Sequence, residues 1–383
     1  MSSDQKLAIN NLLNWYGSKA SQYITLGGYA GTGKTTLISI LRDKIKKKHK
    51  KVKVAFVSYT GKAARVLRNK LDENKTMVSG DFVGTIHSLI YSPIVNSKEE
   101  ITGWKKKEVV EQDLIIIDEA SMVSASIWSD LLSFNKTIIA VGDHGQLPPI
   151  EGSFNLMERP ILKLVEIHRQ ARDNPIIKLS ILAREEGRIP VGVYARGIKK
   201  LDGREAWVAN EVDEELKNYN FETMVLCGYN NTRVKLNKFI RSNLGFETEE
   251  VNVGDKVICL KNNHAKEIFN GMLGTVESLY DKDEKWWETE IEMDDGSFYS
   301  GLIAKDQFGK TSGINFTEKR GRYLKGDLFD FGYALTVHKA QGSQAKKVIL
   351  FEERFSKMTD DEWRRWLYTG ITRAEEELLI IGK

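Results

Sequence analysis

The residues most able to do chemistry lie in one glycine-rich stretch near the N-terminus. Gly28, Gly33, Lys34 and Thr35 have the spacing of a phosphate-binding loop, placed between a short apolar run and a helical pattern. Glycine lets the backbone N–H groups of such a loop converge on an anion, and the helix N-terminus adds unpaired donors. The lysine can reach the β- and γ-phosphates of a nucleotide, and the threonine hydroxyl can bind Mg²⁺. The sequence therefore predicts a site for ATP and Mg²⁺, with the contact residues Gly28, Gly31, Thr32, Gly33, Lys34, Thr35 and Thr36.

Two adjacent acids follow a buried-strand pattern further along the chain. The run 114–117 is entirely apolar, and Asp118 and Glu119 come directly after it. Hydrolysis of a nucleoside triphosphate needs one carboxylate to hold Mg²⁺ and a second to orient and activate the attacking water. We assign the metal to Asp118 and the water to Glu119. The alternative is a polar loop that only caps the strand, which the phosphate-binding pattern upstream disfavours.

A third polar turn, 142–149, follows the next apolar run. It contains Gln146, whose side chain can sense a γ-phosphate by hydrogen bonding. Taken alone, this segment would be a proline-rich turn, and its position after the other two motifs makes it specific. We expect these polar residues at the C-terminal ends of parallel strands.

The pattern of elements that must position these residues is α/β. Strands alternate with helices up to about residue 165, and a second set begins near Asn174. Short alternating runs with turns at about 250–320 predict a small inserted β-barrel, and residues 91–108 predict an inserted β-hairpin. The lysine-rich run 44–53 is better explained as a solvated helix end than as a nuclear-import or DNA-gripping tract.

Length and composition set wide limits. A chain of 383 residues with 41% hydrophobic and 29% charged residues suits two or three globular domains. The net charge of +4 permits a nucleic-acid partner without requiring one. Both cysteines, Cys227 and Cys259, sit in apolar runs and predict buried free thiols in a reducing compartment. No run is long enough to span a membrane and the N-terminus lacks a signal-peptide pattern, so we expect a cytoplasmic protein, in its own cell or in the host cell of a phage.

The order of the motifs resembles that of superfamily 1 helicases of the RecD/Dda type, a group that includes small phage helicases. The resemblance runs from Gln5 to Arg373 and includes the three segments above. The further matching segments are Tyr59–Ala64, Gly84–His87, His168–Gln170, Leu335–Ser343 and Tyr368–Ala374. Tyr59 is a departure, because the family pattern has proline there.

The resemblance implies two RecA-like motor lobes, each built on a parallel sheet. The first would span 1–165 and carry a pin-like hairpin at about 91–108. The second would comprise 166–249 and 321–383, interrupted at 250–320 by an SH3-like β-barrel.

The resemblance also implies roles at the nucleotide. Gln5 would read adenine, Gly342 would lie at the nucleotide, and Arg169 and Arg373 would stabilise charge on the γ-phosphate from the second lobe. ATP binding and hydrolysis would then switch the distance between the lobes. The alternatives are an ion pair of Arg169 with Glu166 and an i,i+4 pair of Arg373 with Glu377. Tyr229 could stack on adenine or pack at a strand end, and the sequence does not decide between the two.

For the nucleic acid, the resemblance places a series of side chains along single-stranded DNA. They are Thr60, Lys62, Thr85, His87, Thr336, His338 and Lys339. Trp104 would lie at the tip of the hairpin, where it could act as a strand-separating wedge. Taken without the resemblance, His87 and His338 would more often be structural hydrogen-bonding groups than ligand contacts.

Together these features predict an ATP-dependent DNA helicase that translocates on single-stranded DNA, in the 5′ to 3′ direction by resemblance. Its substrates would be single-stranded DNA and duplex DNA with a single-stranded tail, its partners replication or recombination proteins, and its state a monomer. The alternatives are a nucleic-acid-stimulated ATPase that remodels protein–nucleic acid complexes or acts on RNA, and a clamp-like switch. A small-molecule kinase is disfavoured, because nothing after residue 165 resembles an acceptor pocket.

Overall fold

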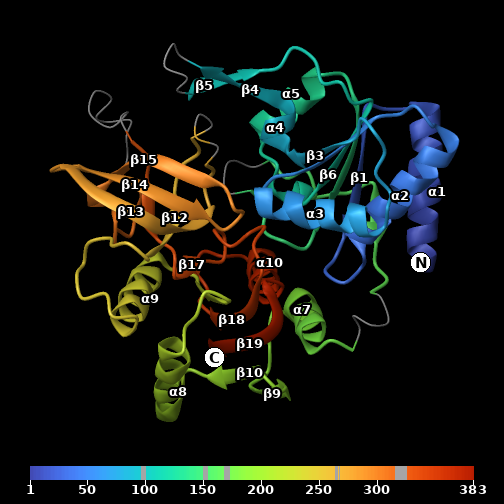
Figure 1. The fold of residues 1–383 in the computed structure, drawn as a ribbon. Helices are drawn as coiled ribbons and strands as arrows, with labels where there is room; N and C mark the ends of the chain where they lie inside the picture. The colour runs from blue at the N-terminus through green and yellow to red at the C-terminus, as the bar shows by residue number, and fades with distance from the viewer. Residues whose placement is uncertain (96–100, 150–153, 168–172, 264–265, 267, 315–325) are drawn as a thin grey trace. The chain divides into compact units, whose positions relative to one another are not determined.

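The computed structural model describes residues 1–95, 101–149, 154–167, 173–263, 266, 268–314 and 326–383. The chain divides into two compact units, each of which is described by itself (Figure 1). The first comprises Met1–Ser92, Trp104–Glu185 and Arg364–Thr372. The second comprises Pro93–Gly103, Glu186–Trp363 and Arg373–Lys383.

The first unit is built on a six-stranded sheet in which all neighbouring strands run parallel, in the order β3-β2-β6-β7-β1-β8. The strands are β1 (Tyr23–Gly28), β2 (Val54–Ser58), β3 (Phe82–Thr85), β6 (Leu114–Asp118), β7 (Thr137–Gly142) and β8 (Leu162–Leu164). Strands β2 and β6 are buried along their whole length. Continuous buried runs of this kind occur where a parallel sheet is covered on both faces.

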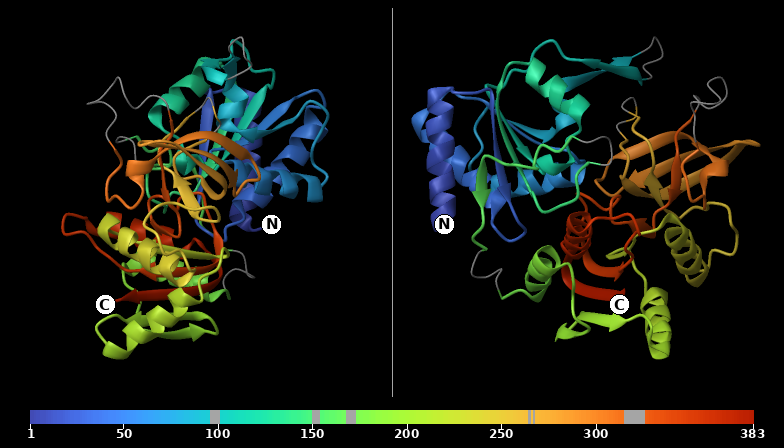
Figure 2. Two further views of the ribbon diagram at one scale, coloured as in Figure 1. Left: turned by 60° about the vertical axis from the view of Figure 1, so that its left-hand side comes forward. Right: turned by 180° about the vertical axis from the view of Figure 1, so that it is seen from behind.

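Helices cover both faces of this sheet (Figures 1 and 2). They are α1 (Ser3–Ser18), α2 (Lys34–Lys48), α3 (Gly61–Glu73), α4 (Ile86–Ile90) and α5 (Ala125–Ser133). One hydrophobic core joins apolar residues of α1, α2 and α3 to one face, and a second core joins α4 and α5 to the other. The result is an α/β/α sandwich. Helix α7 (Pro175–Glu186) contributes to neither of the two cores of this sheet.

A separate two-stranded sheet pairs β4 (Tyr91–Val95) with β5 (Ile101–Lys106). It falls where the sequence predicts an inserted hairpin. Trp104 lies within β5, beyond the connection 96–100, so the expectation that it occupies the tip is wrong. Trp104 is the fourth residue of this strand, which places it away from the connection between the two strands. The connection itself lies outside the described residues.

The second unit has its own six-stranded sheet, in the order β17-β11-β18-β19-β10-β9, parallel except for the edge pair β10–β9. The strands are β9 (Gly192–Ala195), β10 (Ile198–Asp202), β11 (Thr223–Cys227), β17 (Ala334–Thr336), β18 (Ala345–Phe351) and β19 (Ala374–Gly382). Helices α8 (Ala206–Lys217) and α9 (Asn230–Asn243) contribute apolar residues to its core. Helix α10 (Asp360–Ile371) is divided between the units, with Arg364–Ile371 in the first.

A five-stranded antiparallel sheet is also part of the second unit, in the order β15-β14-β13-β12-β16. Its strands are β12 (Lys256–Cys259), β13 (Leu273–Asp283), β14 (Trp286–Met293), β15 (Phe298–Ala304) and β16 (Phe329–Phe331). The last of these lies past residue 320, the boundary expected from the sequence, and three residues before β17 begins. Apolar residues of this sheet and of the parallel sheet form one continuous hydrophobic core.

These observations confirm the predicted α/β class with parallel sheets. The sequence predicts that the first lobe ends at residue 165. By its contacts, however, most of α7 belongs to the first unit.

Candidate functional site

The C-terminal edge of the first sheet collects the motifs of the first unit. Strands β1, β7 and β6 are neighbours, and their register places Gly27 beside Gly142 and Ile117 beside Ala140. The segments that follow these strands therefore leave the sheet side by side. In parallel α/β sheets this edge is where ligands bind.

The phosphate-binding loop has a left-handed backbone at two of its glycines. Gly31 has φ 77° and Gly33 has φ 75°, which residues with a Cβ rarely adopt. A Cβ on Gly28 would lie 2.6 Å from the hydroxyl of Thr32, so the inside of the loop has no room for a side chain there. That hydroxyl donates to the carbonyl of Tyr29 at 2.8 Å and holds the curvature of the loop.

Gln5 braces the same loop from α1. Its Nε2 donates to the carbonyl of Thr32 at 2.9 Å, and its Oε1 accepts from the backbone N–H of Ser2 as half of a capping box. Gln5 is 1% exposed. Its predicted role at adenine stays a prediction, and the structure adds a second role, which is to tie α1 to the loop.

Helix α2 begins at the loop with Gly33 as its N-cap, which supplies no side chain to its first N–H groups. The ammonium of Lys34 turns back and donates to the carbonyls of Gly28 at 2.8 Å and Tyr29 at 3.1 Å. It also lies 3.8 Å from Oδ2 of Asp143. A cation, a helix N-terminus and a glycine-lined curve therefore surround one point, which suits a phosphate group.

Asp118 and Thr35 form the candidate metal position. The Thr35 hydroxyl donates to Oδ2 of Asp118 at 3.2 Å, which places two oxygen ligands of the kind Mg²⁺ prefers next to each other. Asp118 is 7% exposed, and burial, followed by the negative charge of Glu119, raises the pKa of its carboxyl group to about 6. The positive charge of Lys34 opposes this shift. A bound cation would relieve the crowding of negative charge, so the residues fit the metal.

Glu119 has a strained backbone and an unused carboxylate oxygen. Its φ of 54° and ψ of 41° are left-handed, a conformation that costs a side-chain-bearing residue about 1–3 kcal/mol and that recurs at functional sites. Its Oε2 is buried and has no hydrogen-bond partner among the described residues. Its backbone N–H donates to Oδ1 of Asp118 at 3.0 Å, which fixes the two acids relative to each other. The arrangement leaves one buried acceptor available for a water molecule.

Gln146 shows a similar feature. It is 5% exposed, and its Oε1 is buried without a hydrogen-bond partner in the described part of the chain. The segment that carries it is held by α10: Arg365 donates to the carbonyl of His144 at 2.7 Å, and Thr369 accepts from the N–H of Leu147 at 3.0 Å. The segment is therefore held in place, and the amide oxygen of Gln146 can still accept a hydrogen bond.

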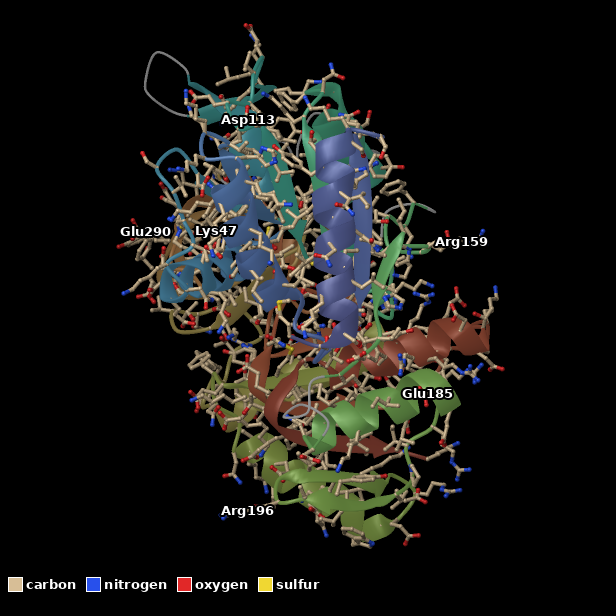
Figure 3. The ribbon with its side chains drawn as sticks, turned by 90° about the vertical axis from the view of Figure 1, so that its right-hand side faces the viewer. Lys47, Asp113, Arg159, Glu185, Arg196 and Glu290 are labelled. Atoms are coloured by element: carbon tan, nitrogen blue, oxygen red, sulfur yellow. The ribbon has the colours of Figure 1, made fainter. Side chains whose placement is uncertain are left out.

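The structure brings further residues to this site that sequence reasoning did not single out. Tyr29 packs against His144 at 4.1 Å between ring centroids, and the Arg184 guanidinium lies 3.7 Å from the centre of its ring. Burial lowers the pKa of His144 to about 4, so this imidazole is neutral at pH 7. Arg184 also donates to Glu185, which Figure 3 labels on α7. A tyrosine inside a glycine-rich loop was the available signal for this cluster.

Tyr368 also reaches the loop, from α10. Its hydroxyl accepts from the N–H of Ala30 at 2.7 Å and donates to Oδ2 of Asp143 at 2.6 Å. The acid directly after Gly142, at the end of a buried strand, was a signal for Asp143 in the sequence. Nothing local indicated that it pairs with a residue 225 positions later.

Candidates in the second unit are placed as follows. Arg373 is 4% exposed, and its Nη1 donates to the carbonyl of Ser343 at 3.1 Å, directly after Gly342, which has φ 74°. The alternative of a helical i,i+4 pair of Arg373 with Glu377 is wrong, because Ala374–Gly382 is strand β19. Arg169 lies outside the described residues.

Tyr229 packs at the end of β11. Its ring lies edge-on against Phe355 with 4.6 Å between centroids, and its hydroxyl donates to the carbonyl of Arg354 at 3.1 Å. The residue is 42% exposed. Of the two readings that the sequence left open, the structure shows the packing one, and stacking on adenine stays a prediction.

Two threonines predicted to contact DNA have a structural task as well. The side chain of Thr60 accepts from the N–H of Ala63 as N-cap of α3, and that of Thr85 accepts from the N–H of Ser88 as N-cap of α4. Thr85 is the last residue of β3, and Thr60 comes two residues after the end of β2, so both lie at the C-terminal edge of the parallel sheet. Their role at DNA stays a prediction, as does that of Lys62, whose side chain lies outside the described part.

The predicted histidine contacts are placed differently from each other. His87 is 3% exposed and lies 6.1 Å from the ring of Tyr59 and 5.7 Å from that of Tyr91, between ring centroids. This is the surrounding of a structural histidine. His338 is half-buried, and burial lowers the pKa of its imidazole.

The remaining nucleic-acid candidates lie in two places. Thr336 ends β17 and is 9% exposed, and the ammonium of Lys339 donates to Oδ1 of Asn270. Trp104 is half-buried, and its indole Nε1 has no hydrogen-bond partner in the described residues. Their contact with DNA stays a prediction.

Among the described residues, the longest apolar helices fall short of what a membrane crossing requires. No group of three or more His, Cys, Asp or Glu side chains in the same residues is arranged to hold a metal.

The chain is similar to known helicases in sequence. Residues 1–204 match the family described as AAA domain, and residues 331–381 match the UvrD-like helicase C-terminal domain. The chain is 28% identical to the ATP-dependent RecD2 DNA helicase of Deinococcus radiodurans over 94% of its own length, but it spans only 47% of that relative. It is 23% identical to the ATP-dependent DNA helicase dda of Enterobacteria phage T4, covering 100% of this chain and 99% of that one.

The fold is shared with a solved structure. The crystal structure of Pif1 helicase from Bacteroides in complex with ADP-AlF3 and ssDNA superposes with a TM-score of 0.51. The match covers 97% of this chain and 91% of that one at 19% identity.

Proposed function

This chain belongs to the AAA domain family, its resemblance to superfamily 1 helicases of the RecD/Dda type is confirmed by its relatives, and from that premise we propose that it is an ATP-dependent DNA helicase. The observation that carries the proposal is the edge of the first sheet. There a phosphate-binding loop, a metal-suited Asp118–Thr35 pair and a strained acid with an unused oxygen follow adjacent strands. An ATPase needs all three of these parts.

Each candidate site residue of the first unit would have a distinct role in ATP hydrolysis. Lys34 and the first N–H groups of α2 neutralise charge on the phosphates. Thr35 and Asp118 would hold Mg²⁺, which would withdraw charge from the phosphate oxygens when bound. Glu119 accepts a proton from the attacking water, for which its buried free oxygen is suited. Gln146 would donate from its Nε2 to a γ-phosphate oxygen, and its buried Oε1 would accept from a water molecule.

The coupling of hydrolysis to movement is proposed on the resemblance. Each unit would be a RecA-like motor lobe, with Arg373 and Arg169 supplying positive charge to the transition state. The parallel sheet in each unit supports the comparison. Opening and closing of the lobes would then move the protein along single-stranded DNA, in the 5′ to 3′ direction.

Two insertions would serve the unwinding itself. The β4–β5 pair would be the pin that meets the duplex, and the five-stranded antiparallel sheet would be the SH3-like barrel. Thr60 and Thr85, at the C-terminal edge of the first sheet, would contact the DNA backbone together with Lys62, Thr336, His338 and Lys339.

A strand-displacement assay tests this function directly. Duplexes with a 5′ tail, a 3′ tail or no tail are incubated with the protein, ATP and Mg²⁺, and the released strand is measured. We expect release from the 5′-tailed duplex only, and no release with Lys34→Ala. Release from no substrate, together with ATP hydrolysis stimulated by single-stranded DNA, would show a translocase or remodelling ATPase instead. Stronger stimulation by RNA than by DNA would identify an RNA substrate.

A further inference from the structure

Tyr368 joins two parts of the nucleotide site through one hydroxyl group. Its oxygen accepts from the backbone N–H of Ala30 in the phosphate-binding loop at 2.7 Å, and its proton goes to Oδ2 of Asp143 at 2.6 Å. The tyrosine is 1% exposed and Asp143 is also 1% exposed, so water does not compete for either bond. Hydrogen bonds to a buried carboxylate are among the stronger ones in proteins.

The same carboxylate oxygen faces the lysine of the loop. Oδ2 of Asp143 lies 3.8 Å from the ammonium of Lys34, while its Oδ1 accepts from the N–H of Gly145 at 2.9 Å. Lys34 therefore has three negative or partly negative neighbours, namely this carboxylate and the carbonyls of Gly28 and Tyr29. A nucleotide phosphate must attract the ammonium more strongly than they do.

The Tyr368 hydroxyl changes that competition. By donating to Oδ2, it satisfies the oxygen nearest to the lysine and spreads its charge, which weakens the attraction between Asp143 and Lys34. By accepting from Ala30, it also fixes one peptide of the loop that must close around the phosphates. Removing the hydroxyl would leave Oδ2 of Asp143 buried without this hydrogen bond, 3.8 Å from the ammonium of Lys34.

We propose that Tyr368 is a positioning residue of the nucleotide site, whose hydroxyl keeps Asp143 from capturing Lys34 and so leaves the lysine available to the phosphates of ATP. The inference rests on the proposed function only in naming ATP as the ligand. It assigns to α10 a task that concerns nucleotide affinity rather than the transition state.

The test compares two tyrosine variants that each lose one buried hydroxyl. Tyr333 in the second unit is a matched control, because its hydroxyl likewise accepts from a backbone N–H, that of Lys256, and donates to a buried carboxylate, that of Asp255. We expect Tyr368→Phe to weaken binding of N-methylanthraniloyl-labelled AMPPNP with Mg²⁺ by about tenfold and to raise KM for ATP more than it lowers kcat. Tyr333→Phe should lower the melting temperature similarly and leave the dissociation constant of the labelled nucleotide within about twofold of the wild type.

A second variant tests the charge competition itself. Asp143→Asn removes the negative charge beside Lys34, while its remaining Oδ1 can still accept from Gly145 and its Nδ2 can donate to the hydroxyl of Tyr368. We expect it to bind the labelled nucleotide about twofold to fivefold more tightly. On that background, Tyr368→Phe should change the dissociation constant by less than about twofold, because no charged oxygen remains to capture the lysine.

Three outcomes would overturn the inference. They are an unchanged dissociation constant in Tyr368→Phe, an equal weakening in both tyrosine variants, and weaker nucleotide binding by Asp143→Asn. The last can be measured even if Tyr368→Phe does not fold. Because nucleotide binding is measured without DNA, a wild type that binds nucleotide but displaces no strand would refute the helicase proposal while leaving this inference testable.

Discussion

At the scale of single residues, two candidate site residues of the first unit have buried oxygen atoms that could still accept a hydrogen bond. Glu119 and Gln146 each bury an oxygen that finds no hydrogen-bond partner in the described residues. An unsatisfied buried oxygen costs about 1–3 kcal/mol. Such a cost persists where a ligand or a water molecule can supply the missing partner.

Lys34→Ala should remove nearly all DNA-stimulated ATP hydrolysis. The ammonium is the cation placed at the N-terminus of α2, and its loss removes charge neutralisation at the phosphates, so DNA-stimulated turnover should fall by about 10²–10³-fold while DNA binding is retained. The control is Lys47→Ala on the same helix, whose side chain is 73% exposed and which Figure 3 labels. Turnover near the wild-type rate in Lys34→Ala would show that the site lies elsewhere.

Glu119→Gln should slow ATP hydrolysis but make the nucleotide-free protein more stable. Loss of the base should slow hydrolysis by about 10²–10⁴-fold with ATP binding intact. The same change removes a negative charge beside Asp118, one of the two causes that raise the pKa of that buried carboxyl group. We therefore expect the nucleotide-free variant to be more stable than the wild type at pH 7, by about 1 kcal/mol.

The pH dependence of unfolding checks the origin of this gain. The folded-state pKa of Asp118, about 6, lies above its ordinary value of 3.8, so between pH 4 and 6 the folded protein holds a proton that the unfolded chain has lost. The contribution of Asp118 to the free energy of unfolding is therefore full below pH 4 and is lost as the pH rises through 6. Glu119→Gln should flatten this loss in melting curves recorded without nucleotide or Mg²⁺. An equal slope in both proteins would rule out the charge explanation.

At the scale of elements, the two units differ in what caps the helix that follows a parallel strand. In the first unit, the N-terminus of α2 has glycine as its cap and is open to an anion. In the second unit, the corresponding turn from β11 into α9 is closed by a carboxylate of the chain itself. Glu353 accepts from the N–H groups of Gly228 at 2.8 Å and Tyr229 at 2.9 Å, and from the hydroxyl of Thr232 at 2.5 Å.

Glu353→Ala should therefore destabilise the second unit. Three donors lose their shared acceptor, and loss of a helix-capping group of this kind costs about 1–2 kcal/mol of unfolding free energy. The measurement is denaturant unfolding, with Glu249→Ala as control, because the exposed pair of Glu249 with Lys238 should contribute little. Equal midpoints for the two variants would contradict a capping role.

At the scale of the whole molecule, the proposed catalytic residues are divided between the two units. Lys34, Asp118, Glu119 and Gln146 belong to the first, and Arg373 belongs to the second. If one turnover needs residues of both units, a substitution in either unit should lower the rate of ATP hydrolysis.

Arg373→Ala is the test at this scale. We expect kcat to fall by about 10³-fold with little change in nucleotide binding, since the arginine would act on charge that develops in the transition state. Because Arg373 is 4% exposed and bonded to Ser343, the melting temperature of the variant must be recorded beside its rate. Arg204→Ala, at an exposed position of the same unit, serves as control. A variant that keeps its fold and its wild-type kcat would exclude the finger role.

The sequence by itself determined the α/β class and the site's main parts. The phosphate-binding loop and Asp118–Glu119 were predictable because strand, turn and helix are encoded by spacings within a few residues, and parallel strands bring such turns to one edge. The tertiary structure alone decided the left-handed backbone of Glu119, the capping tasks of Thr60 and Thr85, the strand position of Trp104 and the closure of α9 by Glu353. It also decided the bridge from Ala30 through Tyr368 to Asp143. Backbone dihedrals and contacts between residues hundreds of positions apart depend on how the sheets pack, and no local periodicity records them.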